Sequence, residues 1–337
     1  MPFSSREWHL VRRPVGEPTT SDVALVTATV PDPGPGHVVI RNDYLSVDPY
    51  MRGRMDDRES YIPPFGLNEP MTGTAVGTVI SSQSAEVPVG ATVTHFLGWR
   101  DYAILPAGQV QIVDTQLASP QAYLGVLGTT GLTAWAALKE IAPVKEGDAV
   151  FISGAAGAVG SVAGQLARKL GASTVIGSAG GPDKVKRLTQ HYGFDAGLDY
   201  REGDIAGQLA KAAPNGIDVY VDNVGGDHLD AALQVMNLRG HVALVGAISM
   251  YNATELPAGP PHLPLAIGKR ITLRGMNVGD HLHMVPEFIQ KASGWISDGS
   301  LVADETVVHG IGNAFEGFQA MMRGVNVGKM LVRLSHT

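Results

Sequence analysis

The sequence predicts an α/β protein with two parts, a compact barrel-like β domain and a doubly wound parallel sheet. Residues 1 to about 125 contain short β-prone runs separated by turns rich in proline and glycine, which is typical of a small β domain. From about residue 147 onward, strand-like and helix-like segments alternate, as they do in parallel sheets covered by helices. At 337 residues the chain is long enough to give both parts a core.

The composition excludes several classes of function. With 44% hydrophobic and 17% charged residues, the chain has the composition of a soluble globular protein. A net charge of −7, with no basic tract longer than Arg12-Arg13, argues against nucleic acid or a membrane surface as a partner. The absence of cysteine excludes disulfides, thiolate nucleophiles and a zinc site built on sulfur. The polar N-terminus and the lack of a run of about 20 apolar residues favour a cytoplasmic location.

The β-rich part contains five expected strands and one unusual loop. The loop, residues 48–64, interrupts the strands with polar and aromatic side chains. Because loops on a rigid scaffold often carry function, Tyr50 and Tyr61 are candidate site residues. The alternative is that each tyrosine only packs there, with its hydroxyl in water. The expected strands are residues 23–30, 37–45, 74–81, 91–96 and 102–105.

A glycine-rich turn lies between a buried strand at residues 149–153 and a helix that starts near Val159 and stops at Gly171. In the turn, Gly157 would let the backbone approach a pyrophosphate, and Gly160 would let the helix pack closely on the strand. Alanine replaces the usual first glycine at position 155. The pattern predicts a dinucleotide site, although such a turn can also simply connect two elements. The expected pyrophosphate contacts are Ala156, Gly157, Ala158 and Val159.

The next strand is expected at residues 173–176, and its end should distinguish NAD from NADP. NAD enzymes carry an acidic residue there, whereas this chain has Gly177 and Ser178, followed by Lys184 and Arg187. A hydroxyl and two cations would favour the 2′-phosphate of NADP(H). The alternative is that Lys184 is only a solvated residue of the helix that starts near Pro182.

The remaining segments continue the alternation of strands and helices. Ligands of such sheets bind outside the carboxyl ends of the strands, where Asn223, the turn Gly246, Ala247, Ile248 and Ser249, and Tyr251 are expected. The expected elements are a glycine turn and then a helix within 124–141, a strand at 218–222 with a helix to 236, strands at 241–245 and 271–274, a helix around 285–296, and a strand, helix and strand at 301–334.

Motifs of other enzyme classes are missing from the sequence. The chain has no G-x-S-x-G, H-E-x-x-H, G-K-S/T phosphate loop or EF-hand motif, and no tyrosine is followed four places later by lysine. The run from Asp280 to His283 could suggest a metal site. We interpret its two histidines as incidental, because no carboxylate cluster is near them in the sequence.

Several longer motifs together are specific for one family. Over nearly its whole length the chain resembles the zinc-independent medium-chain dehydrogenases/reductases of the prostaglandin reductase and leukotriene B4 12-hydroxydehydrogenase type. The motifs are LSVDPYMRGRM (45–55), LGTTGLTAW (127–135), SGAAGAVGSVAGQLA (153–167), DVYVDNVGG (218–226), GAISMYN (246–252) and GVNVGK (324–329). The resemblance implies a GroES-like catalytic domain at 1–125, an NADP-binding Rossmann domain at 126–298 and a C-terminal segment, 299–337, that returns to the first domain.

The resemblance also implies site residues. Lys184 and Tyr200 look like holders of the 2′-phosphate end, and the 246–251 turn would lie beside the nicotinamide. No metal is expected, because zinc-bearing relatives have Gly-His-Glu where this chain has Gly-Thr-Ala at 73–75. Many relatives have Met-Pro where this chain has two threonines, at 129 and 130, so contacts there are expected to differ. The further expected cofactor contacts are Tyr50, Thr130, Asn223, Met276, Asn277 and Asn326.

The reaction implied by the resemblance is NADPH-dependent reduction of the carbon–carbon double bond of an enone or enal. Negative charge would build on the carbonyl oxygen, and Tyr251 and Tyr61 are similar in position to the tyrosines that donate to it in relatives. A quinone reductase or an alcohol dehydrogenase on the same scaffold is the nearest alternative, and a non-catalytic NADPH-binding protein is another. Relatives are often dimers, so a homodimer is a further expectation.

Overall fold

The computed structural model describes residues 3–255 and 257–334 and divides the chain into two compact units. The first unit comprises Met1–Leu124, Glu305–Asn326 and Met330–Thr337, and the second comprises Gly125–Asp304 and Val327–Lys329. The outermost residues of two predicted domains, 1–2 and 335–337, lie outside the described residues. Both units are therefore assembled from segments that are distant in sequence.

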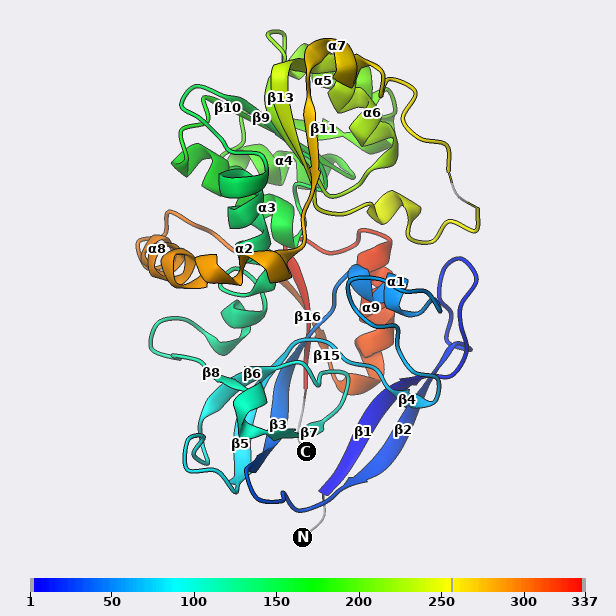
Figure 1. Cartoon of the computed structure of the whole chain (residues 1–337), viewed down its shortest axis with the longest axis vertical. Coiled ribbons are helices and arrows are strands. Elements are labelled where there is room, and N and C mark those ends of the chain that lie inside the picture. Colours follow the sequence, from blue (N-terminus) through cyan, green and yellow to red (C-terminus); the bar gives the residue numbers. More distant parts are fainter. Residues whose placement is uncertain (1–2, 256, 335–337) are drawn as a thin grey trace. The chain divides into compact units, whose positions relative to one another are not determined.

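The first unit contains two sheets whose recorded strand pairs are antiparallel (Figure 1). One sheet has the order β2-β1-β4, and the other has the order β15-β16-β3-β5-β6-β8, with β7 paired to β3. The C-terminal strand thus joins a sheet made mostly by the N-terminal part. The strands are β1 (Phe3–Leu10), β2 (Val23–Val30), β3 (His37–Ser46), β4 (Glu69–Pro70), β5 (Ala75–Ser82), β6 (Thr92–His95), β7 (Tyr102–Pro106), β8 (Gln111–Ile112), β15 (Glu305–His309) and β16 (Lys329–Arg333).

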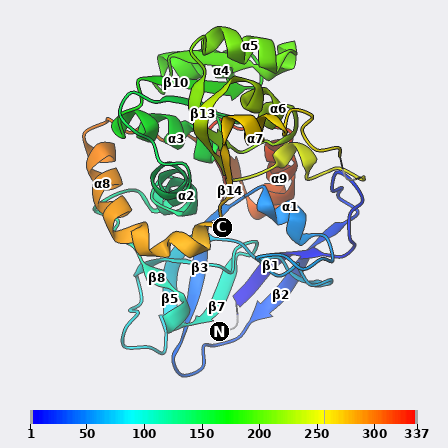
Figure 2. The same ribbon diagram turned by 45° about the horizontal axis from the view of Figure 1, so that its top comes forward.

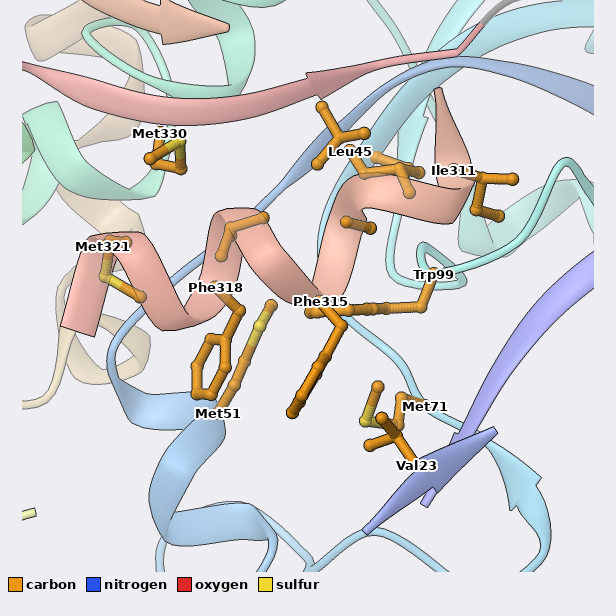
Figure 3. Close-up of a cluster of buried hydrophobic side chains, with 14 of the residues drawn as sticks. Val23, Leu45, Met51, Met71, Trp99, Ile311, Phe315, Phe318, Met321 and Met330 are labelled. Atoms are coloured by element: carbon orange, nitrogen blue, oxygen red, sulfur yellow. The ribbon is translucent and has the colours of Figure 1, made fainter. Parts of the chain in front are cut away.

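The loop predicted at residues 48–64 contains a short helix, α1 (Tyr50–Arg54). Its Met51 is fully buried against α9 (Ala314–Met322), where the side chains of Phe315 and Phe318 lie beside it (Figure 3). Met55, directly after the helix, is also fully buried. These contacts fix α1 in the core, so its polar side chains are held by a rigid element.

The second unit is built on a parallel sheet of six strands in the order β11-β10-β9-β12-β13-β14. This is the doubly wound order, in which the chain leaves β9 first toward one edge and later toward the other, and it confirms the predicted Rossmann fold. Stacked rings of Phe151 and Tyr220, 4.9 Å apart, lie in its core. The strands are β9 (Ala149–Ile152), β10 (Thr174–Ala179), β11 (Ala196–Asp199), β12 (Ile217–Asp222), β13 (Met236–Leu244) and β14 (Thr272–Gly275).

At least one helix lies between consecutive strands of this sheet, as connections between parallel strands require. Helix α2 packs on α3 and α5 packs on α6, as both views indicate (Figures 1 and 2). The helices are α2 (Thr129–Ala136), continued by a π-helical turn η3 (Ala137–Ile141), α3 (Ala158–Lys169), α4 (Pro182–Gln190), α5 (Ile205–Ala212), α6 (Gly226–Val235), α7 (Leu265–Lys269) and α8 (Val285–Ser297). Short 3₁₀ turns are η1 (Ala107–Gln109), η2 (Pro120–Leu124), η4 (Tyr200–Glu202), η5 (Ile248–Met250), η6 (Val278–Met284) and η7 (Ile311–Asn313).

Two strands extend at least three residues beyond their predicted limits, and one of these differences changes the site. β10 runs to Ala179, three residues beyond the expected end, because residues 176–179 pair with β11. β13 starts at Met236 rather than at His241. Gly180 and Gly181 therefore follow the second strand, and Ser178 lies inside it.

Candidate active site

The glycine turn after β9 brings α3 against the strand. Gly154 has a φ of +60°, and Gly157 is the residue before the first turn of α3. A Cβ on Gly160 would lie 2.4 Å from the carbonyl oxygen of Gly154 and 2.7 Å from the Cα of Ala155. Only glycine fits there at this distance, so the backbone N–H groups at the start of α3 stay at the carboxyl edge of the sheet, as an anion site requires.

The methyl group of Ala155 is accommodated by a glycine, Gly177, on the neighbouring strand β10. The side chain of Ala155 is fully buried, and a Cβ added to Gly177 would lie 2.6 Å from its methyl group. The missing side chain on β10 thus makes room for the extra methyl in the turn. The amide of Ala155 also donates to the carbonyl of Ser178 at 2.8 Å, which ties the turn to β10.

Two cations and a tyrosine gather at the end of β10. Burial lowers the pKa of Lys184, in the first turn of α4, and the positive charge of Arg201 lowers it further. A Cβ on Gly180 would lie 2.7 Å from the hydroxyl of Tyr200 and 2.8 Å from Nε of Arg201, so both side chains cover the backbone there. Neighbouring cations repel each other, and an anion bound between them would relieve the repulsion.

Arg201 was missed by the sequence analysis, although it directly follows Tyr200 at the end of a strand. Among the described residues it forms no ion pair with a carboxylate. Asp199 lies near it, but its Oδ1 accepts from the amides of Gly181 at 2.9 Å and of Arg201 at 3.0 Å. This carboxylate therefore holds the loop in place.

Two residues predicted to contact the 2′-phosphate have other surroundings in the structure. Ser178 has no exposed surface, and its Oγ has no partner among the described residues, because the side chain lies inside β10. The guanidinium of Arg187 donates to Asp304 at 2.8 Å from the last turn of α4. We therefore remove both residues from the proposed phosphate site and add Arg201.

The turns after β12 and β13 form a continuous rim. The Oδ1 atom of Asp222 accepts from the amides of Val224 (3.0 Å) and Gly225 (2.8 Å), and its backbone carbonyl accepts from the amide of Gly246 at 3.0 Å. The side-chain Nδ2 of Asn223 donates to the carbonyl of Ser153 at 2.8 Å. This bond fixes the carboxamide of Asn223, and its Oδ1 faces away from Ser153 as an acceptor.

Tyr251 follows the 3₁₀ turn η5 at the same rim. Its hydroxyl oxygen accepts from the amide of Ala247 at 3.3 Å, which folds the ring back over the 246–249 turn. Ser249 closes this turn by donating from Oγ to the carbonyl of Val224 at 2.6 Å. Since the hydroxyl oxygen of Tyr251 accepts a hydrogen bond, its own proton is left to be donated.

A segment from the end of the chain lies along the glycine turn. The amide of Gly328 donates to the carbonyl of Ala156 at 2.8 Å, and the amide of Lys329 donates to the carbonyl of Asp304 at 2.9 Å. Gly328 has a φ of +63°, and a Cβ there would lie 1.9 Å from the Asp304 carbonyl oxygen. Asn326 directly precedes this segment and is half-buried in the first unit.

The other predicted cofactor residues of the second unit have local partners. Thr130, in the first turn of α2, donates from Oγ1 to the carbonyl of Gly125 at 2.8 Å. Asn277, just after β14, accepts on Oδ1 from the amide of Gly279 at 3.0 Å. The amide of Met276 donates to the carbonyl of Leu244 at 3.0 Å, which places Met276 at the carboxyl edge of β13 and β14.

Tyr50 and Tyr61 belong to the first unit. Tyr50 is the first residue of α1 and is half-buried, whereas Tyr61 is 69% exposed. The hydroxyls interact electrostatically, and both also interact with Arg54.

The two histidines of the predicted loop lie beside one carboxylate. Nδ1 of His281 is 2.8 Å and Nε2 of His283 is 3.0 Å from the two carboxylate oxygens of Glu140, a neighbour that the sequence did not indicate. No group of three or more His, Cys, Asp or Glu side chains in residues 3–255 and 257–334 is arranged to hold a metal ion. In the same residues, no helix is long and apolar enough to cross a membrane.

Two family models match the chain. One, described as the N-terminal domain of oxidoreductase, matches residues 6–113, and the other, described as zinc-binding dehydrogenase, matches residues 158–294.

Relatives with printed activities match nearly the whole chain. The NADPH-dependent curcumin reductase of Escherichia coli (strain K12) is 39% identical over 98% of this chain and 97% of its own. The 2-alkenal reductase (NADP(+)-dependent) of Nicotiana tabacum is 38% identical over 95% of this chain and 94% of its own. The crystal structure of CurA in complex with NADPH from Vibrio vulnificus has a TM-score of 0.94 and 40% identity, and the match covers 98% of this chain and 100% of that one.

Proposed function

The chain belongs to the zinc-independent medium-chain dehydrogenases/reductases, and on that premise we propose that it reduces the carbon–carbon double bond of α,β-unsaturated ketones or aldehydes with NADPH. The chain is accordingly an NADP-dependent oxidoreductase. The observation that carries the proposal is the Tyr251 hydroxyl at the rim of the parallel sheet, whose oxygen accepts from the amide of Ala247. An enone reductase needs such a donor where negative charge develops.

The residues at the carboxyl edge of the parallel sheet fit NADPH. A Cβ on Gly160 would separate α3 from the glycine turn, so the missing side chain leaves a cradle for a pyrophosphate. Lys184 and Arg201 together supply the positive charge that a 2′-phosphate needs. We assign the pyrophosphate to residues 156–159 and the 2′-phosphate to Lys184, Tyr200 and Arg201. When bound, NADPH supplies the hydride.

The further cofactor contacts keep their predicted assignment as part of this proposal. In the second unit these are the rim residues after β12, β13 and β14 and the start of α2. In the first unit they are Tyr50 and Asn326. The rim residues are Asn223, Gly246, Ala247, Ile248, Ser249, Met276 and Asn277, together with Thr130.

The proposed role of Tyr251 is to stabilise the oxygen of the substrate. As the β-carbon of the enone accepts the hydride, negative charge moves to the carbonyl oxygen and an enolate forms. A hydrogen bond from Tyr251 strengthens as this charge grows, which lowers the transition state more than the ground state. Tyr61 is the second proposed donor. A proton from water at the α-carbon completes the reduction and balances the reaction.

A comparison of acceptors tests this proposal against its alternatives. NADPH oxidation is measured with an enone, a quinone and a saturated ketone at equal concentrations. We expect turnover with the enone, and a saturated ketone as the product identified by mass. Turnover with the quinone alone would replace the proposal by quinone reduction, and turnover with the saturated ketone alone would replace it by alcohol dehydrogenation. Cofactor binding without turnover of any acceptor would favour a non-catalytic protein.

A further inference from the structure

The 3₁₀ turn η4 carries two of the residues assigned to the 2′-phosphate, and it lies on the surface. Its three residues, Tyr200, Arg201 and Glu202, are all exposed. A Cβ on Gly180 would lie 2.7 Å from the hydroxyl of Tyr200 and 2.8 Å from Nε of Arg201, so both polar groups lie over the same stretch of backbone. An exposed turn gains little from core packing and opens easily. Hydrogen bonds from neighbouring elements must therefore keep these groups in place.

Gln208, on helix α5 of the same unit, is hydrogen-bonded to both ends of this turn. Its Oε1 accepts from the amide of Asp199 at 3.1 Å. Its Nε2 donates to the carbonyl of Asp199 at 2.9 Å and to the carbonyl of Gly203 at 2.7 Å. Asp199 directly precedes η4, and Gly203 directly follows it. One carboxamide thus bridges the two residues between which the turn lies.

The three partners of Gln208 require the side chain of an amide. A backbone N–H can only donate and a carbonyl can only accept, so the side chain must offer one acceptor and two donors at once. A glutamate would lack the donors, and a methionine of similar length would lack all three bonds. The next residue, Leu209, is fully buried in the core of the second unit. The carboxamide is therefore presented by a helix that is itself anchored.

Two further contacts orient single residues of the turn. The carboxylate of Asp199 accepts from the amide of Arg201 at 3.0 Å. The ring of Tyr200 lies 5.5 Å from the ring of His228, centre to centre, at an angle of 69°. His228 is buried in the first turn of α6, so this edge-on contact limits the motion of the tyrosine ring. Gln208 differs from both, because it holds the backbone that carries Tyr200 and Arg201 together.

We propose that Gln208 is a positioning residue that makes the protein prefer NADPH to NADH, because it holds the η4 turn in the conformation that a 2′-phosphate needs. This inference rests on the proposed function and deepens its assignment of the 2′-phosphate. Without the carboxamide, the turn has to become ordered when the phosphate binds, which weakens the binding of NADPH. NADH has no 2′-phosphate, so its binding does not depend on the order of the turn.

Isothermal titration calorimetry with NADPH and with NADH tests whether Gln208 acts through Tyr200 and Arg201. We expect Gln208→Met to raise the Kd for NADPH by about tenfold and to change the Kd for NADH by less than about twofold. The same substitution is then made in a Tyr200→Phe/Arg201→Ala background. There it should change the Kd for NADPH by less than about twofold, because the groups that Gln208 positions are already missing.

The matched control is Gln165→Met, in α3 of the same unit. The carboxamide of Gln165 bridges another loop, since it accepts from the amide of Val302 and donates to its carbonyl, both at 2.8 Å. Its loss should lower the melting temperature and change the two Kd values by the same factor. An equal rise of both Kd values in Gln208→Met, or an equal rise for NADPH in both backgrounds, would overturn the inference. If Gln208→Met does not fold, Gln208→Ala takes its place, since alanine favours a helix.

Binding constants need no acceptor, which separates this inference from the proposed function. A wild type that prefers NADPH but does not reduce the enone rejects the proposed reaction, and Gln208 is then still judged by the two Kd values. A wild type that reduces the enone and prefers NADPH, but whose Gln208→Met variant keeps that preference, rejects the role of Gln208 alone. A wild type that binds NADPH and NADH equally well rejects both the proposed 2′-phosphate site and the role of Gln208.

Discussion

At the scale of single residues, the hydroxyl of Tyr251 carries the proposed chemistry. Its oxygen already accepts from the amide of Ala247, so the substitution Tyr251→Phe removes a donor and leaves the ring in place. Loss of one donor to a developing oxyanion costs about 2.7–4 kcal/mol where nothing replaces it. We expect a smaller loss here, about ten- to a hundredfold in kcat, because the second proposed donor, Tyr61, or water would partly replace the lost hydrogen bond.

The measurement for Tyr251→Phe is the single-turnover rate of hydride transfer by stopped flow, with NADPH affinity measured in parallel. The affinity should stay nearly unchanged. The control is Tyr123→Phe, which removes a hydroxyl bonded to the carbonyl of Asp114 elsewhere in the chain. If Tyr251→Phe reacts as fast as the wild type, Tyr251 only packs beside the cofactor.

Lys184 and Arg201 give a second prediction, on the choice of cofactor. A charge-assisted hydrogen bond to phosphate contributes about 1.5–3 kcal/mol, so Lys184→Ala should raise KM for NADPH roughly ten- to a hundredfold. Arg201→Ala should act in the same direction. Neither substitution should alter KM for NADH much, because NADH has no 2′-phosphate.

The control for this prediction is Lys186→Ala, which removes an exposed lysine from the same helix. Steady-state kinetics of each variant give KM for NADPH and KM for NADH. If the substitutions raised KM for NADPH and KM for NADH by the same factor, Lys184 and Arg201 would not bind the 2′-phosphate.

The residue pattern predicted the part of this site that depends on local sequence. It missed the part that depends on contacts between residues distant in sequence. Gly160 could be assigned from the motif, because a close approach of helix and strand needs a residue without a side chain at that spacing. Ser178 was expected just after a strand ending at Ile176. Pairing with β11 extends β10 by three residues, so Ser178 lies inside the strand. Arg187 was taken for a phosphate ligand because its distance in sequence from Asp304 hides the contact between them.

At the scale of elements, the packing of α3 on β9 gives a third prediction. Gly160→Ala would place a methyl group 2.4 Å from a backbone oxygen, which cannot move away as a side chain could. Overpacking of this kind typically costs about 1–3 kcal/mol. We expect a lower free energy of unfolding in urea and weaker NADPH binding, because the helix start is displaced.

The matched control is Gly294→Ala in α8, another glycine inside a helix. Nothing lies within 4 Å of the position of its added Cβ. Alanine there should stabilise the protein by about 0.5–1 kcal/mol through helix propensity. Equal effects of the two substitutions on stability would mean that α3 does not depend on the close approach of Gly160.

Elements with a strong local pattern were predicted, and elements without one were missed. β2 was predicted with its observed bounds, because β-branched and apolar residues fill it between turn residues. β11, with the sequence AGLD, has no β-branched residue, and pairing with β10 makes it a strand. β1 was missed because residues 3–10 contain four polar or charged side chains in a row, and only the long-range pairing with β2 reveals it.

At the scale of the whole molecule, the chain is expected to work without a metal. It contains no cysteine, and the position that carries Gly-His-Glu in zinc-bearing relatives is Gly-Thr-Ala. Dialysis against EDTA should therefore leave kcat unchanged, with metal content measured by mass spectrometry. A loss of activity that zinc restores would overturn this prediction and the mechanism based on Tyr251.

Asp304 gives a prediction on stability and pH. Burial alone would raise the pKa of this carboxyl, but hydrogen bonds from Tyr192 and Arg187 outweigh it and hold the pKa below its usual value. A group with a lowered pKa in the folded state adds stability above its unfolded pKa of about 3.9, and the stability is lost as the pH falls through the lowered value.

Asp304→Asn should therefore lower the free energy of unfolding at pH 7, and the difference from the wild type should shrink as the pH falls below about 4. Urea titrations at several pH values measure it. Asp32→Asn, in an exposed loop, is the control and should follow the wild type throughout. A difference that is independent of pH would mean that Asp304 contributes by packing alone.

Because the chain is synthesised from its N-terminus, Gly328 is made after the strands of the parallel sheet. This glycine, which bonds to Ala156 in the glycine turn, follows all six strands of the parallel sheet in the sequence. On the ribosome, domains fold as their sequence emerges, so all six parallel strands are available while Gly328 is still in the exit tunnel. A nascent chain thus holds the strands of the parallel sheet before its glycine turn is bonded to Gly328. The hydrogen bond from Gly328 to Ala156 is added to a sheet whose strands have already emerged.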